Sequence, residues 1–307
     1  MKLKSIKLTF VILLFIIPVL SRSQSVEVID SLNISIDNKN NNTSKNNKNK
    51  ISYTEIDYFS MPSEEIIDLL EKQPSFSIYK NNYFITGIPT NKRISKSTAD
   101  VKFQLSIKQR LVNIKLPFNS FLYLTYTQKS FWDIYKLSSP FADNNYNPGL
   151  LWVTPLVFDN FKGMAALSVE HESNGEGGDD SRGWNFVSLS CSYFVTNCIS
   201  AQLRLWYGWG LNRDNPDLYE YKGYGLAALN YVTPKERFWC SFIINPCKGF
   251  RAFNTQLEVN FRISTKLNQY FFIQWYNGYA ENLLEYKNYY SMIRAGICLK
   301  PQFRNIY

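Results

Sequence analysis

Cysteine pairs, long apolar runs and histidine are all scarce in this chain. Its five cysteines lie in the C-terminal half at irregular spacing and without a CxxC pair, which argues against a disulfide framework and against a zinc site. Beyond residue 24 no apolar stretch approaches about 20 residues, so the sequence excludes helical membrane spans. The only histidine is His171, and it stands in a segment that is otherwise polar.

The N-terminus has the layout of a secretory signal peptide. Lys2, Lys4 and Lys7 precede the apolar run LTFVILLFIIPVL, and small polar residues follow it. That run is short for a membrane anchor, and no cysteine follows it to carry a lipid, so we expect residues 1–24 to be cleaved on export. Cleavage lowers the net charge from +9 to about +5, too small and too scattered a charge to predict binding to nucleic acid.

Two further segments precede the main domain. Residues 25–52 include the Asn/Lys-rich tract DNKNNNTSKNNKNK, which has almost nothing to bury and predicts a disordered tether. Residues 53–98 form a short lead-in with one helical segment, PSEEIIDLLEKQ, in which Pro62 and Ser63 precede acidic residues that favour a helix start.

From residue 99 to residue 307 the chain alternates apolar and polar residues. The segments VKFQLSIKQRL and FNTQLEVNFRIS show a strict period of two, which places one set of side chains on each face of a strand. Further strands are predicted near residues 121–130, 150–158, 163–173, 185–195, 199–211, 220–232, 237–245, 267–279 and 289–300. The segment NYFITGI at 82–88 can supply a twelfth strand.

Both a water-soluble sandwich and a membrane barrel accommodate many such strands. The strands are about 10 to 13 residues long, which suits a tilted membrane strand. Short turns alternate with long polar loops at 131–148, 174–184 and 212–219. The polar faces carry full charges such as Glu258 and Arg204, which fit a polar lumen better than a sandwich surface. We therefore predict an all-β transmembrane antiparallel β-barrel of about twelve strands.

Strand phase places His171 on the outer wall of that barrel. In MAALSVEHESN, His171 and Ser173 share the parity of the apolar Leu167 and Val169, and Asn185 is in phase with the apolar face of the next strand. Polar groups facing lipid are costly unless they are paired. A hydroxyl becomes a nucleophile when an imidazole takes its proton and a third group orients the ring. The three residues therefore form a candidate Ser/His/Asn triad.

The segment HESNGEGGDDSRGWN resembles the signature of the outer membrane phospholipase A family: His, any residue, Ser, Asn, Gly, and then Ser-Arg-x-Trp-Asn. The segments YTQKSFW, SSPFADNNYNP and DNPDLYEYKGY also resemble that family in the same order, and the likeness covers roughly residues 75–303. It implies a twelve-stranded barrel in the outer membrane of a Gram-negative bacterium, which hydrolyses phospholipids and lysophospholipids with Ca²⁺ and is activated by reversible homodimerisation.

By position, the resemblance makes Ser173 the nucleophile, His171 the general base and then acid, Asn185 the residue that orients His171, and Gly175 the donor of an oxyanion N–H. The same resemblance assigns Ca²⁺ ligands and a dimer contact. The ligands are the Ser181 hydroxyl, the carbonyl of Glu176 and the carbonyl of Ser138 from a partner chain, and the dimer contact is Gln128. Relatives often carry an acid where this chain has Gly178, which leaves a further calcium site in the monomer open. The alternative is a catalytically silent outer-membrane barrel, either a small porin or a degenerate relative.

Overall fold

The computed structural model describes residues 62–114, 116–158, 161–211, 215–264 and 267–301. The predicted signal peptide and the predicted tether lie outside these residues. The described helices and strands are α2 (Ser63–Glu71), β1 (Phe76–Ile78), β2 (Asn82–Pro89), β3 (Asp100–Arg110), β4 (Phe121–Trp132), β5 (Phe141–Phe158), β6 (Phe161–Ser173), β7 (Gly183–Phe194), β8 (Ile199–Trp209), α3 (Leu218–Lys222), β9 (Gly225–Val232), β10 (Phe238–Cys247), β11 (Ala252–Arg262), β12 (Gln269–Gly278) and β13 (Tyr290–Leu299). None of the helices among these residues is long and apolar enough to cross a membrane.

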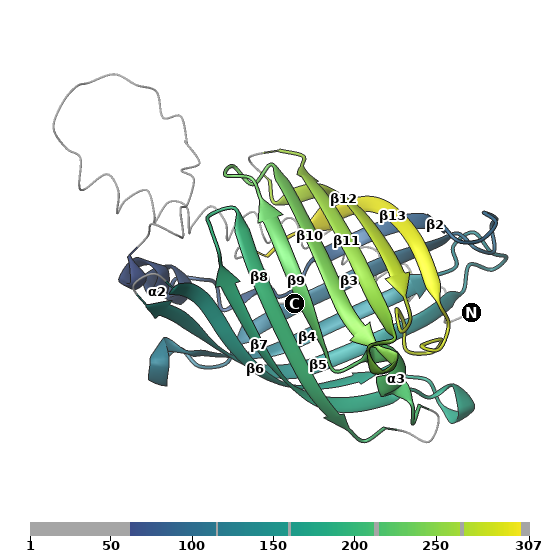
Figure 1. The fold of residues 1–307 in the computed structure, drawn as a ribbon, viewed down its shortest axis with the longest axis horizontal. Coiled ribbons are helices and arrows are strands. Elements are labelled where there is room, and N and C mark those ends of the chain that lie inside the picture. Colours follow the sequence, from purple (N-terminus) through teal and green to yellow (C-terminus); the bar gives the residue numbers. More distant parts are fainter. Residues whose placement is uncertain (1–61, 115, 159–160, 212–214, 265–266, 302–307) are drawn as a thin grey trace, which may run out of the picture.

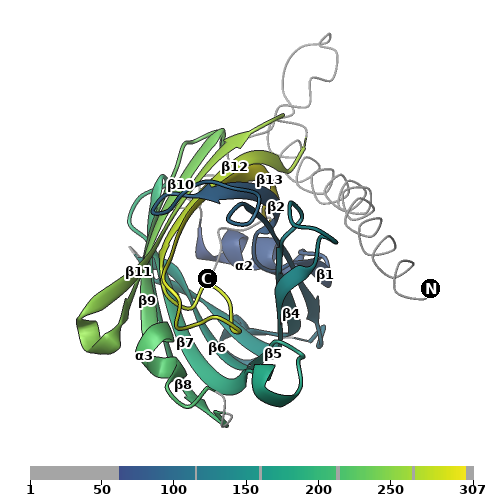
Figure 2. The same cartoon turned by 90° about the vertical axis from the view of Figure 1, so that its right-hand side faces the viewer.

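The strands form a closed antiparallel barrel (Figures 1 and 2). Each strand from β2 to β13 pairs with its neighbours in the sequence, and the pairing of β13 with β2 closes the ring. The barrel therefore has twelve strands, as predicted, with the segment at 82–88 supplying one of them. The short β1 pairs with β3 beyond the end of β2. Closure gives each of the strands β2 to β13 a partner on both sides, as a sheet in a membrane requires.

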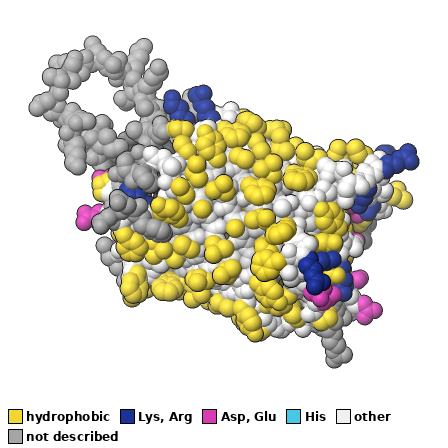
Figure 3. Space-filling model, viewed as in Figure 1, with side chains coloured by type: hydrophobic (Ala, Val, Ile, Leu, Met, Phe, Trp, Pro, Cys, Tyr) yellow, Lys and Arg dark blue, Asp and Glu magenta, His cyan; other side chains and the backbone are white. Residues whose placement is uncertain are grey.

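The two faces of the wall differ as strand parity predicts. Outward side chains such as Leu189, Leu203 and Leu229 are at least half exposed, and hydrophobic side chains cover the outer wall (Figure 3). The lumen instead holds charged side chains in ion pairs. Arg294 contacts Glu281 and Asp100 at 2.6 and 2.7 Å, and Lys102 contacts Glu281 at 2.9 Å. This polar filling confirms the membrane barrel and rules out the sandwich.

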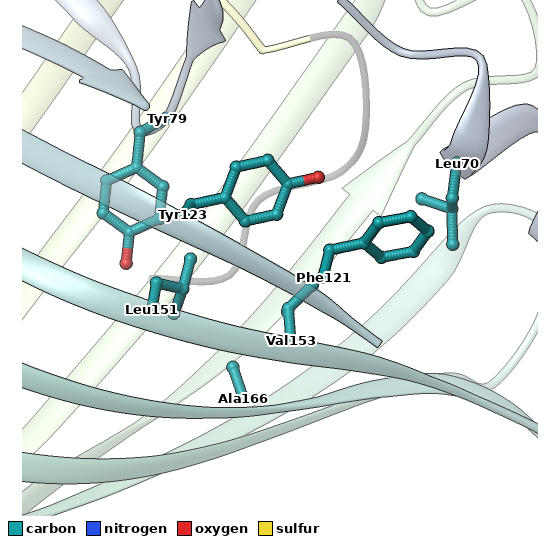
Figure 4. Packing of buried hydrophobic residues seen from close by; sticks show 7 residues of the cluster. All are labelled: Leu70, Tyr79, Phe121, Tyr123, Leu151, Val153 and Ala166. Carbon is teal, nitrogen blue, oxygen red and sulfur yellow. The ribbon is translucent and has the colours of Figure 1, made fainter. Parts of the chain in front are cut away.

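Helix α2 packs into one end of the barrel, opposite α3 (Figures 1 and 2). Leu70 joins a buried cluster whose other members come from strands β4, β5 and β6 and from the segment before β2, as Figure 4 shows: Tyr79, Phe121, Tyr123, Leu151, Val153 and Ala166. The Arg110 guanidinium donates to the last carbonyls of the helix, those of Leu70 at 2.8 Å and Glu71 at 2.9 Å. These contacts hold α2 against the inside of the wall.

Replacing Leu70 by alanine is expected to lower the free energy of unfolding by about 2 to 5 kcal/mol, because it leaves a cavity under α2. Equilibrium unfolding by urea measures this change. Leu70→Met conserves volume and should cost less than about 1.5 kcal/mol. Equal stability of the alanine and methionine variants would mean that α2 is not docked in the lumen.

Two predicted boundaries are wrong. Residues 131–148 are not a loop, because β4 ends at Trp132 and β5 begins at Phe141. The start of β5 is polar since Asp143 and Asn145 face inward, where they accept hydrogen bonds from the backbone N–H of Leu283 at 3.0 and 3.2 Å. Residues 220–224 are not part of a strand, because 218–222 form α3 and β9 begins at Gly225.

Candidate active site

His171 and Asn185 lie opposite each other on the outer wall, at one end of the barrel. They are a register pair of the β6–β7 hairpin, and Ser173 is opposite Gly183 two residues further on. Val169, on the same face of β6 as His171, is 50% exposed, whereas Glu170 on the other face is 3% exposed. The structure therefore places the three polar residues of the candidate triad on the lipid-facing side.

The His171 ring is oriented by a hydrogen bond to Asn185, with 2.9 Å between Nδ1 and Oδ1. An amide oxygen only accepts, so the bond places the proton on Nδ1. The other ring nitrogen, Nε2, is then the unprotonated one and can act as a base. A neutral amide orients the ring without adding a charge.

Ser173 follows His171 on the same face, about 6.6 Å along the strand from Cα to Cα. Among the described residues no hydrogen bond joins its hydroxyl to His171. A serine side chain has three staggered rotamers, and catalytic hydrogen bonds often shorten only when substrate binds. The structure thus brings the base and its orienting residue together and leaves Ser173 within side-chain reach.

The neighbouring strand β5 is only partly paired beside the site. Its ladder with β6 pairs Tyr146 with Ser173 and Gly149 with Glu170, and it is interrupted between these pairs. Pro148, in the gap, has no N–H to donate. The Asn147 side chain partly replaces the ladder by donating to the His171 carbonyl at 2.9 Å.

The loop after Ser173 is fastened by Asn174, which is 2% exposed. Its side chain donates to the Asp180 carbonyl at 2.8 Å and accepts from the Arg182 N–H at 2.9 Å. Gly175 follows with φ 73°, and a Cβ there would lie 2.9 Å from the Tyr146 ring. Both the backbone conformation and the close ring require glycine at this position. Asn174 was assigned no role from the sequence, although its place in the motif was a signal for one.

The loop offers oxygen atoms rather than a cluster of metal-binding side chains. Glu176, Asp179 and Asp180 are exposed, and Ser181 is half-buried beside them. Within the described ranges no three His, Cys, Asp or Glu side chains are grouped to hold a metal ion. A hydroxyl, carbonyls and nearby carboxylates are the hard oxygen donors that Ca²⁺ accepts. The donor set of this loop therefore fits Ca²⁺, with water completing the coordination.

Ser138 and Gln128 lie toward the same end of the barrel as Ser173. Ser138 is exposed at the tip of the β4–β5 hairpin, with φ 64°. Gln128 points outward, but it is 6% exposed and already paired in its own chain. It accepts from Tyr126 Oη at 3.2 Å and donates to Ser130 Oγ at 3.1 Å. Both ends of the Gln128 amide therefore have partners within one chain, and its role as a dimer contact stays a prediction.

Residues 69–299 match the family model described as Phospholipase A1. The chain belongs to the phospholipase A1 family. It is similar to the phospholipase A1 of Escherichia coli K12, with 31% identity over 215 residues that cover 66% of this chain and 71% of the relative. The phospholipase A1 of Salmonella typhimurium is also 31% identical, over 213 residues with the same coverage.

Solved structures agree with this family assignment. The outer membrane phospholipase A of E. coli superposes with a TM-score of 0.67 at 26% identity, covering 75% of this chain and all of that one. An active-site mutant of the same protein, in which alanine replaces an asparagine, gives 0.67 at 25% identity over 78% of this chain and 98% of that one. This member of the phospholipase A1 family is therefore a carboxylic ester hydrolase, built as an outer-membrane β-barrel of a Gram-negative bacterium.

Proposed function

We propose that this phospholipase cleaves the acyl esters of phospholipids and lysophospholipids with Ser173, His171 and Asn185 on the outer wall of the barrel. The observation that carries the proposal is the hydrogen bond between His171 and Asn185 on a face that otherwise contacts lipid. Polar groups on a lipid-facing wall are costly, so an imidazole oriented beside a serine favours a catalytic role over a structural one. The asparagine replaced in the E. coli active-site mutant supports the role given to Asn185.

In the proposed reaction His171 Nε2 takes the proton of Ser173 as the serine oxygen attacks the ester carbonyl. The tetrahedral oxyanion accepts a hydrogen bond from the backbone N–H of Gly175. His171 then gives its proton to the departing lysophospholipid oxygen, which leaves an acyl-serine. Water, deprotonated by His171, releases the fatty acid and restores Ser173. Asn185 keeps the ring in the tautomer that each proton transfer needs.

We also propose that the enzyme uses Ca²⁺ in a dimer. The Ser181 hydroxyl and the Glu176 carbonyl would hold the ion together with the carbonyl of Ser138 of the partner subunit. When bound, Ca²⁺ supplies positive charge beside the developing oxyanion. Both chains then contribute to one site, so dimerisation would activate the enzyme. A Salmonella typhi relative is known as a dimer with bound calcium, and it shares this fold with a TM-score of 0.66.

Removing Ca²⁺ is expected to abolish fatty acid release from phosphatidylethanolamine micelles. Release should be measured with Ca²⁺, with EDTA, and with EDTA followed by excess Ca²⁺, on protein kept in the same detergent. Equal release with and without EDTA would reject the metal. No release under any condition would favour the catalytically silent barrel.

A further inference from the structure

Glu172 lies between His171 and Ser173 in the sequence, and its side chain points to the opposite side of the wall. There its Oε2 accepts the indole N–H of Trp184 at 2.8 Å and also pairs with the Lys222 ammonium. Trp184 directly precedes Asn185. The inward neighbours of all three triad residues are thus joined in one hydrogen-bonded group, which Lys222 reaches from α3.

Side chains of β7, β8 and α3 pack tightly around the hydrogen-bonded group of Glu172, Trp184 and Lys222. Trp184 is 2% exposed, stacks on Phe186 with 4.2 Å between ring centroids and meets Tyr219 of α3 edge-on at 6.0 Å. Lys222 Nζ also lies 5.2 Å from the centre of the Trp184 ring. A Cβ on Gly208 would lie 2.4 Å from Tyr219 Oη and 2.6 Å from Trp184, so β8 leaves no room for a shift. Helix α3 is therefore packed against the back of the catalytic hairpin.

The contacts from α3 matter because the β6–β7 hairpin has fewer backbone hydrogen bonds on its β5 side. The β5–β6 ladder is interrupted opposite His171 and Glu172, where Pro148 cannot donate. On that side the Asn147 side chain donates to the His171 carbonyl at 2.9 Å in place of a regular ladder bond. Backbone freedom at Glu172 would rotate the two outward side chains on either side of it, since neighbouring residues of a strand share one backbone twist.

We propose that Lys222 is a positioning residue of the reaction, which holds the backbone between His171 and Ser173 through Glu172 and Trp184. The inference rests on the triad proposed above. Lys129 also interacts electrostatically with Glu172 from β4, but it belongs to the wall and cannot connect α3 to the hairpin. The connection from Lys222 sets how closely the serine oxygen approaches the imidazole, and a misplacement of about 1 Å costs about 100-fold in rate.

The test compares Lys222→Met, Lys222→Arg and the double variant Glu172→Gln/Lys222→Met in the full-length enzyme with Ca²⁺. We expect Lys222→Met to lower kcat about tenfold or more with KM within about twofold. The rate at which a sulfonyl fluoride labels Ser173 should fall by the same factor. Lys222→Arg should restore both. The double variant should stay low, because its charges balance but α3 is no longer connected to the hairpin.

Lys287→Met is the matched control. Lys287 forms its ion pair with Asp217 at the other end of α3, at 2.8 Å, and not with a carboxylate of β6 or β7. Its kcat and labelling rate should equal those of the wild type. Unchanged kcat in Lys222→Met overturns the inference, and so does recovery in the double variant, which would point to an unbalanced charge. An equal loss in Lys287→Met also overturns it. A wild-type enzyme that is neither active nor labelled at Ser173 would instead refute the proposed triad.

Discussion

Alanine at Ser173 is expected to lower kcat for fatty acid release by a factor on the order of 10⁴ to 10⁶, leaving the barrel folded. The variant keeps His171 and its hydrogen bond to Asn185 but has no oxygen to form the acyl-enzyme. Titration of released fatty acid measures the loss. The same variant should no longer react with a sulfonyl fluoride, which labels one serine in the wild type.

Non-additivity provides the control for this result. When two residues act as one unit, replacing either of them removes nearly all of the enzyme's activity. Ser173→Ala/His171→Ala should therefore be no slower than Ser173→Ala alone. Multiplying losses in the double variant would indicate two independent contributions. Full activity of Ser173→Ala would require another nucleophile and end the triad hypothesis.

Replacing Glu281 by glutamine is expected to lower the free energy of unfolding by about 3 to 5 kcal/mol. Glu281 lies in the loop between β12 and β13 and is 3% exposed. Its carboxylate pairs with Lys102 at 2.9 Å and with Arg294 at 2.6 Å, so the variant leaves two buried cations short of a partner. Urea unfolding measures the change.

An exposed ion pair serves as the comparison. Asp68 and Lys72 on α2 are 2.7 Å apart, but both side chains are largely exposed, so Asp68→Asn should cost at most about 1 kcal/mol. Equal effects of the two substitutions would mean that water screens the Glu281 network and that the lumen is open.

Acid should weaken the same network. Burial would raise the pKa of Glu281, but the charges of Arg294 and Lys102 outweigh it and lower that pKa to about 2. A depressed folded-state pKa contributes stability that is complete above the unfolded value, near 4.5, and is lost as the pH falls toward about 2. Stability of the wild type should therefore fall in this range more than that of Glu281→Gln.

Strand parity predicted the wall of the barrel because the inside and outside of a membrane barrel differ sharply in polarity. Where the two faces of a strand do not differ in polarity, strand parity could not predict the strand. The start of β5 is polar on both faces, and on the inner face Asp143 accepts hydrogen bonds from the N–H groups of Leu283 and Leu284. Period two is invisible there, and the segment looked like a loop.

Some features of the candidate site could likewise be predicted from the sequence, and others depend on the three-dimensional fold. Parity alone placed His171, Ser173 and Asn185 on one face, and the motif gave their roles. The intramolecular partners of Gln128 depend on Tyr126 and Ser130 side chains, whose conformations the sequence does not reveal. The link from Lys222 to Glu172 spans 50 residues and exists only because α3 folds back over the hairpin.

His171 and Asn185 lie on the outer surface of a closed barrel. This position determines how the substrate reaches the site. In the proposed reaction a phospholipid reaches these two residues by lateral diffusion within its leaflet, without passing through water or the lumen. Turnover should therefore follow the mole fraction of cleavable lipid in the leaflet, and diluting the whole suspension with buffer should leave the rate per enzyme unaltered.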